Sequence, residues 1–246
     1  SNNKLKHSYS DLISIFQLND IKNKYPHEIS AGEAQRVSIA RSIISNPDLL
    51  LLDEPFSNLD NSLRNELQME IKKIIKENGI TTIIVTHDSN EAFYLADRCG
   101  VFVGGMLKQF DTPYNIYHYP KSLEVVDFLK RGVILTVKVI NKNSLKHETL
   151  GIINGKFGCS NLKELIPGEE VKLLIQPDDL QHDDNSKLKL EIVDRKFRGT
   201  NFIYALKLTK EETVSVLVES HHEHLHENND SFGIKSPIII NHLVCF

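Results

Sequence analysis

Two adjacent carboxylates, Asp53 and Glu54, end a run of four leucines at residues 49–52. Such a run is typical of a strand buried on both faces of a parallel sheet, and these sheets bind ligands at the carboxyl ends of their strands. There Asp53 suits a Mg²⁺ position, direct or through water, and Glu54 suits a general base that orients an attacking water. The alternative, an acidic surface turn, is disfavoured by the four leucines.

Three other polar groups have weaker individual signals. His87 ends the apolar stretch 80–86, where a histidine can sense a phosphate, although a solvated side chain is the commoner case. The loop 30–33 opens a helix and offers backbone N–H groups and the positive end of the helix dipole to a phosphate. Its serine and glutamate also have the spacing of an ordinary capping box. The polar turn 57–60 by itself indicates only a helix cap.

Alternating helices and strands are expected to position these groups. Apolar spacing predicts helices at 34–44 and 61–78, the second ending at Gly79, and apolar runs predict strands at 49–52 and 80–86. Shorter elements follow: a helix at 89–96 capped by Ser89, strands at 101–103 and 106–110, and helices at 113–117 and 123–129.

Beyond about residue 130 the pattern changes to recurring strands separated by Gly, Asn and Asp, without a helix of convincing length. This spacing predicts a small antiparallel barrel or sandwich. The expected strands are 133–140, 171–175, 188–197, 201–208, 213–218 and 238–246.

In their order and spacing, the four polar motifs resemble the second half of an ATP-binding cassette (ABC) ATPase, over roughly residues 25–129. Residues 30–32 resemble its signature loop, 49–54 its Walker B strand, 57–60 its D-loop, and His87 its switch histidine. The implied fold is α/β, the second half of a P-loop NTPase domain at 1–130, followed by an all-β OB-like accessory (TOBE-type) domain at 131–246.

The resemblance also implies roles. Asp53 would hold Mg²⁺, Glu54 would polarise the hydrolytic water, and His87 would contact the γ-phosphate of ATP. Ser30 and Gly32 would meet the γ-phosphate bound on the opposite subunit of a homodimer. The implied nucleotide-binding set is Ser30, Ala31, Gly32, Glu33 and Asp60.

Two residues depart from the family pattern. Ala31 stands where glycine is usual and costs about 1 kcal/mol if the backbone there needs a positive φ. Glu33 stands where glutamine is usual and adds negative charge near a polyanion.

The phosphate loop GxxxxGK[ST] is also missing, because the Gly155–Lys156 pair is followed by Phe157 where a hydroxyl belongs. We therefore expect this chain to be the C-terminal portion of an ABC ATPase subunit. It would lack the half that contains this phosphate loop (Walker A), and it would be inactive alone.

Residues 25–28 and 112–117 are similar to importer ATPases, and 195–200 with 220–224 are more weakly similar to the ferric-iron type. The expected function is the ATP-hydrolysing energising subunit, a translocase, of a bacterial ABC importer for ferric iron. Open alternatives are an importer ATPase for a sugar or polyamine, or a non-catalytic dimerisation or regulatory module. Implied partners are a second copy, integral-membrane permease subunits and, indirectly, a periplasmic or surface solute-binding protein.

Composition narrows the remaining classes. A net charge of −4 in 246 residues disfavours a nucleic-acid binder, and three dispersed cysteines disfavour a disulfide framework or a cysteine-based zinc site. Apolar runs such as 49–52 are far too short for a membrane helix, so the expected location is cytoplasmic, peripheral on the inner face of the membrane. The histidines at 221, 222, 224 and 226 favour a solvated loop over a metal site.

Overall fold

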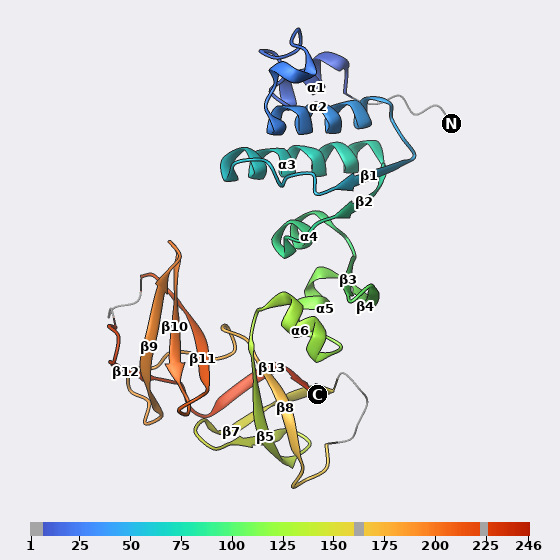
Figure 1. Cartoon of the computed structure of the whole chain (residues 1–246). Coiled ribbons are helices and arrows are strands. Elements are labelled where there is room, and N and C mark those ends of the chain that lie inside the picture. The colour runs from blue at the N-terminus through green and yellow to red at the C-terminus, as the bar shows by residue number, and fades with distance from the viewer. Residues whose placement is uncertain (1–6, 160–164, 222–225) are drawn as a thin grey trace. The chain divides into compact units, whose positions relative to one another are not determined.

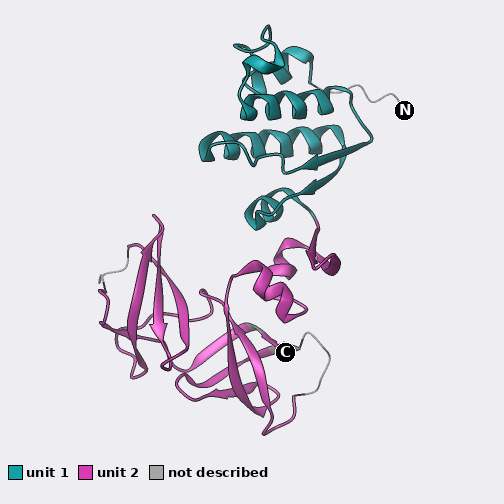
Figure 2. Cartoon of the chain, in the orientation of Figure 1, with its two compact units in different colours: residues 1–97 teal, residues 98–246 magenta. Residues whose placement is uncertain are grey.

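The computed structural model describes residues 7–159, 165–221 and 226–246. The chain forms two compact units, residues 1–97 and residues 98–246, and each is described by itself (Figure 2). Among the described residues, no helix has the length and apolar character needed to cross a bilayer.

The first unit alternates helices with two parallel strands (Figure 1). Strands β1 and β2 are paired in register from Leu49 opposite Thr81 to Asp53 opposite Val85, so both strands end at the same edge of the sheet. The predicted helices and strands of this region are confirmed, whereas α1 had no counterpart in the prediction. The elements are α1 (Tyr9–Ile15), the 3-10 helix η1 (Pro26–Glu28), α2 (Ala31–Ile44), β1 (Leu49–Asp53), α3 (Asn61–Asn78), β2 (Thr81–Val85) and α4 (Ser89–Leu95).

Strand β1 is buried on one face only, so the expectation of a strand covered on both faces is wrong. Leu50 and Leu52 are 3% and 7% exposed and share a core with apolar residues of α2 and α3. Leu51, between them, is 65% exposed. Successive side chains of a strand point to opposite faces, and in the described part of the chain only one face of this sheet carries helices.

The ends of two helices follow local sequence rules. Gly79 adopts a left-handed φ of 65° at the C-terminus of α3, as the sequence predicts. Helix α4 is capped one residue earlier than expected, because Asp88 rather than Ser89 accepts a hydrogen bond from the backbone N–H of Asn90. An Asp side chain is at least as good an N-cap acceptor as Ser, so the correction has an ordinary cause.

The second unit begins with a hairpin and two short helices, and every later element in its described residues is a strand. The order β13-β7-β6-β5-β8 closes into a barrel, and β11-β10-β9-β12 form a four-stranded sheet. The elements are β3 (Cys99–Val103), β4 (Met106–Asp111), α5 (Pro113–His118), α6 (Leu123–Leu129), β5 (Val133–Asn141), β6 (Ser144–His147), β7 (Gly151–Cys159), β8 (Glu170–Ile175), β9 (Lys189–Phe197), β10 (Asn201–Lys207), β11 (Thr213–Glu219), β12 (Ser231–Gly233) and β13 (Ile238–Cys245).

A closed five-stranded barrel confirms the predicted OB-like class for this region. The expectation of a purely antiparallel arrangement is wrong, because β13 pairs with β7 in parallel. Strands β6, β7 and β12 were not predicted.

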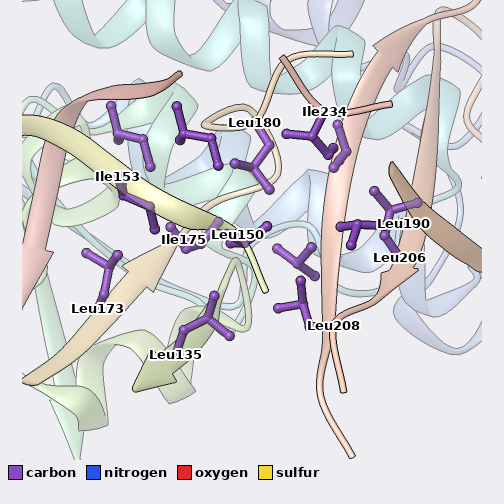
Figure 3. Packing of buried hydrophobic residues seen from close by; sticks show 14 of the residues in the cluster. Leu135, Leu150, Ile153, Leu173, Ile175, Leu180, Leu190, Leu206, Leu208 and Ile234 are labelled. Atoms are coloured by element: carbon purple, nitrogen blue, oxygen red, sulfur yellow. The ribbon is translucent and has the colours of Figure 1, made fainter. Parts of the chain in front are cut away.

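The barrel and the four-stranded sheet share one hydrophobic core (Figure 3). Leu135 and Leu173 come from the barrel, whereas Leu190 and Leu206 come from the sheet, and all four are buried. Residues 98–130 also lie with this unit. Val126 of α6 packs against Leu174 and Val244, and the side-chain amide of Gln176 donates to the carbonyl of Tyr117 at 2.9 Å. The compact units therefore divide after residue 97, whereas the domain boundary predicted from the sequence lies at residue 130.

Candidate active site

The carboxyl ends of β1 and β2 bring Glu54 and His87 into direct contact. The backbone N–H of Glu54 continues the strand pairing by donating to the carbonyl of Val85 at 2.8 Å. One carboxylate oxygen, Glu54 Oε1, then accepts from the backbone N–H of His87 at 3.0 Å and lies 2.8 Å from His87 Nδ1. Two residues that the sequence singled out separately therefore form one paired site.

Glu54 has a backbone conformation that only a few non-glycine residues adopt, with φ at 46°. Its carbonyl accepts hydrogen bonds from Gln35 Nε2 at 2.6 Å and from Ser57 Oγ at 3.0 Å. Left-handed conformations at such residues cost on the order of 1–3 kcal/mol and occur often at functional sites, where neighbouring contacts hold them in place. Here these contacts fix the direction in which the carboxylate leaves the strand.

The pairing also favours the protonated form of the histidine. The hydrogen bond to Glu54, followed by the charge of the same carboxylate, raises the pKa of His87 above its ordinary value. The His87 side chain is 81% exposed, so water and small ligands reach the ring. The ion pair with Glu54 needs the protonated ring, so it is lost as pH rises through the raised pKa of His87.

Asp53 is the last residue of β1 and is exposed beside Glu54. Carboxylate oxygens are the ligands that Mg²⁺ prefers, and an exposed position suits an ion that keeps several of its waters. Asp53 therefore fits a Mg²⁺ ligand at this edge of the sheet.

The segment that carries His87 is held by buried polar contacts. Thr86 Oγ1 donates to the carboxylate of Glu91 at 2.8 Å and accepts from the backbone N–H of Asp88 at 3.0 Å. Glu91 is buried, and Arg64 lies 3.9 Å from it. These contacts fix the turn after β2, which positions the histidine.

The loop at residues 30–33 forms the predicted capping box. Ser30 Oγ accepts from the backbone N–H of Glu33 at 3.3 Å, and the Glu33 carboxylate accepts from the backbone N–H of Ser30 at 2.7 Å. The backbone hydrogen bond from Ser30 lowers the pKa of Glu33, which keeps it negatively charged. Ala31 is the first residue of α2 and has no positive φ, so the strain considered for it from the sequence does not arise.

Gly32 is required by close packing. A Cβ atom at this position would lie 2.9 Å from the carbonyl oxygen of Asn58, in the polar turn before α3. Any side chain would therefore push the two loops apart. In the same turn, Asp60 caps α3 by accepting from the backbone N–H of Leu63 at 3.0 Å, as expected for an N-cap.

Gln35 joins these loops, and sequence reasoning assigned it no role. Its side chain donates to the carbonyl of Glu54, and its Oε1 accepts from the backbone N–H of Asn58 at 3.3 Å. One amide therefore connects the start of α2, the carboxylate turn and the polar turn. The only available signal was its place one turn into the helix, which many surface glutamines share.

The chain is similar in sequence to several known proteins. The ABC transporter family model matches residues 2–57. The chain is 33% identical over 232 residues to the spermidine/putrescine import ATP-binding protein PotA of Mesomycoplasma hyopneumoniae (strain 232), covering 94% of this chain and 48% of that protein. It is 32% identical over 225 residues to the Fe(3+) ions import ATP-binding protein FbpC of Fusobacterium nucleatum subsp. nucleatum, covering 89% of this chain and 59% of that protein.

One similar solved structure is a dimeric ATP-binding cassette in a post-hydrolysis state, bound to ADP and Pi. The match covers 42% of this chain and 45% of the chain in that structure. The sequence identity between this chain and that structure is 30%, and the TM-score is 0.40.

The fold class is thus α/β, in a region that matches the ABC transporter family model over residues 2–57, followed by β-sheets consistent with a TOBE-like domain, as the sequence predicted. The chain is similar to ATP-binding subunits of importers and spans about half the length of the curated relatives it matches. The ferric-iron assignment is not favoured by these relatives, because proteins named for polyamine import match at the same level of identity.

Proposed function

We propose that this chain supplies the hydrolytic half of an ATP site in the energising subunit of an ABC importer. The observation that carries the proposal is the Glu54–His87 pair at the carboxyl ends of two parallel strands, with Asp53 beside it. This combination provides a base, a phosphate-sensing cation and a metal ligand at one edge of a sheet.

Each residue has a separate task in this proposal. Asp53 would hold Mg²⁺, which supplies positive charge next to the transferred phosphate. His87 donates to Glu54 in the structure, and its exposed ring is free to turn toward a phosphate oxygen instead. Once that hydrogen bond moves, the Glu54 carboxylate accepts a proton from the attacking water.

The partners are proposed from the same resemblance. Ser30 and Gly32 would face the nucleotide bound on the other subunit of a homodimer, and permease subunits would dock on the dimer at the cytoplasmic face of the membrane. A solute-binding protein would act indirectly, through the permease.

For the transported solute we favour a polyamine. Support comes from relatives named for spermidine and putrescine import in Mesomycoplasma hyopneumoniae, which is 33% identical, and in Chromobacterium violaceum, which is 34% identical. Ferric iron is the second candidate, because a relative named for Fe(3+) import is 32% identical.

The test uses the complete subunit, reconstituted with its permease. Glu54→Gln should keep MgATP binding and lower ATP turnover by at least tenfold, which corresponds to about 1.4 kcal/mol in the barrier. Glu148→Gln, at an exposed position outside the ATPase region, is the matched control and should keep full turnover. A Glu54→Gln subunit with more than a tenth of the parent's turnover would rule out the base.

Uptake of radiolabelled spermidine and of ferric iron by cells that carry the parent or the Glu54→Gln subunit separates the two solutes. Energised uptake of iron, without uptake of spermidine, would refute the polyamine assignment and leave the catalytic assignment intact.

A further inference from the structure

Three metal-ligating side chains converge in the second unit, far along the sequence from the carboxylates of the ATPase region. His182 and Asp184 lie between β8 and β9, and His226 lies shortly before β12. His182 Nε2 is 3.0 Å from Asp184 Oδ1, His226 Nε2 is 3.4 Å from the same oxygen, and the two Nε2 atoms are 3.3 Å apart. The same three atoms therefore form a nearly equilateral triangle.

The size of this triangle matches a tetrahedral metal site. Zinc lies about 2.0–2.1 Å from imidazole nitrogen and carboxylate oxygen, which puts neighbouring ligand atoms of a tetrahedron about 3.3–3.4 Å apart. The observed separations of 3.0, 3.3 and 3.4 Å need only small adjustments to reach that value. A water molecule can complete the fourth position.

The orientation of His182 also fits a metal ligand. Its Nδ1 lies 3.0 Å from the carbonyl oxygen of Gly233, which only accepts, so Nδ1 carries the proton. In the neutral ring Nε2 then carries the lone pair, and it is the atom that faces Asp184 and His226. A hydrogen bond from the second ring nitrogen to a backbone carbonyl is the common way in which proteins orient metal-ligating histidines.

Packing restricts both rings. The side chains of His182 and His226 are 5% and 13% exposed, and their ring centroids lie 4.2 Å and 5.3 Å from that of Phe232. The carbonyl of His226 also accepts from Arg195 Nη1 at 2.7 Å, which anchors the backbone of this residue. Asp184 is 38% exposed and leaves a path by which an ion can enter.

Gly233 contributes a close backbone approach. A Cβ atom at residue 233 would lie 2.0 Å from the carbonyl oxygen of Asp183. The backbone N–H of Asp183 also donates a hydrogen bond to the carbonyl of Gly233 at 3.0 Å. The loop of His182 and strand β12 are therefore tightly joined at the cluster.

We propose that His182, Asp184 and His226 form a binding site for a divalent transition-metal ion of the Zn²⁺ class. Two imidazoles and one carboxylate suit zinc and its neighbours rather than the hard ions Mg²⁺ and Ca²⁺. The ion ties the loop after β8 to the segment before β12, so its role is to stabilise the accessory region. For His226 this differs from the solvated loop expected from the sequence. His221 is exposed as expected, and His222 and His224 lie outside the described residues.

The competing explanation is a hydrogen-bonded cluster that shares protons without a metal. Calorimetric titration of the metal-free 246-residue chain with ZnCl₂, together with its melting temperature, distinguishes the two. We expect one strong site per chain and a melting temperature that rises with Zn²⁺. Asp184→Asn and His226→Asn should each weaken binding by more than about tenfold and remove the rise.

The neighbouring histidines need their own control, because a run of histidines in sequence can bind zinc by itself. A variant with His221, His222 and His224 all changed to Asn keeps the proposed ligands and should bind Zn²⁺ like the parent. Asp184 is the most exposed ligand, so Asp184→Asn keeps the test valid even if a histidine variant fails to fold. Binding that survives Asp184→Asn, binding that disappears in the triple variant, or no strong binding by the parent would each overturn the proposal.

Discussion

The neighbouring leucines of β1 give a direct test of which face of the β1–β2 sheet is covered. Leu52 is 7% exposed within the core of the first unit, and Leu51 is 65% exposed. Changing each to Ala in turn removes the same atoms from adjacent positions on opposite faces. The chemical change is the same at both positions, so the difference between the two substitutions reports how each side chain packs on its face of the sheet.

The expected magnitudes are well separated. Leu52→Ala should cost about 2–5 kcal/mol, as for other buried leucines, because it leaves a cavity. Full burial of a leucine side chain contributes about 1.5–3 kcal/mol, and Leu51 is only about one third buried, so Leu51→Ala should cost less than about 1 kcal/mol. With about 4–8 °C per kcal/mol for a unit of this size, the two melting temperatures should differ by several degrees.

The assay is thermal and urea unfolding of the full chain, followed by helical circular dichroism, because the predicted long helices belong to the first unit. Leu50→Ala, at a position 3% exposed, is a second buried control and should behave like Leu52→Ala. Equal losses for Leu51→Ala and Leu52→Ala would refute the reasoning, since they would mean that both faces of β1 are covered in solution.

Three further predictions concern the site. An NMR titration should give His87 a pKa above its ordinary value, and Glu54→Gln should lower it; an unchanged value would contradict the pairing. Gly32→Ala should destabilise the chain by about 1–3 kcal/mol, because the new Cβ atom clashes with the Asn58 carbonyl, although helix propensity alone predicts a gain in stability. Increased stability of this variant in urea unfolding would show that the two loops separate freely. The 246-residue chain should bind MgATP weakly, because it contains no GxxxxGK[ST] loop, and calorimetric binding in the micromolar range would disprove this.

Local patterns in the sequence determined much of the first unit. Helix spacing, the glycine stop at Gly79 and the capping box of Ser30 and Glu33 depend on residues a few positions apart, and each is present in the structure. The order of the motifs around Glu54 and His87 also led to the predicted class of site, because that order is a property of the chain alone.

Tertiary structure decided the features that depend on residues far apart in the sequence. Which face of β1 is buried depends on the helices that pack there, and four identical leucines contain no such information. The role of Gln35 depends on a carbonyl 19 residues away, and the parallel pairing of β13 with β7 depends on closure of the barrel. His182 and His226 are 44 residues apart, and only folding brings their nitrogens within 3.3 Å of each other.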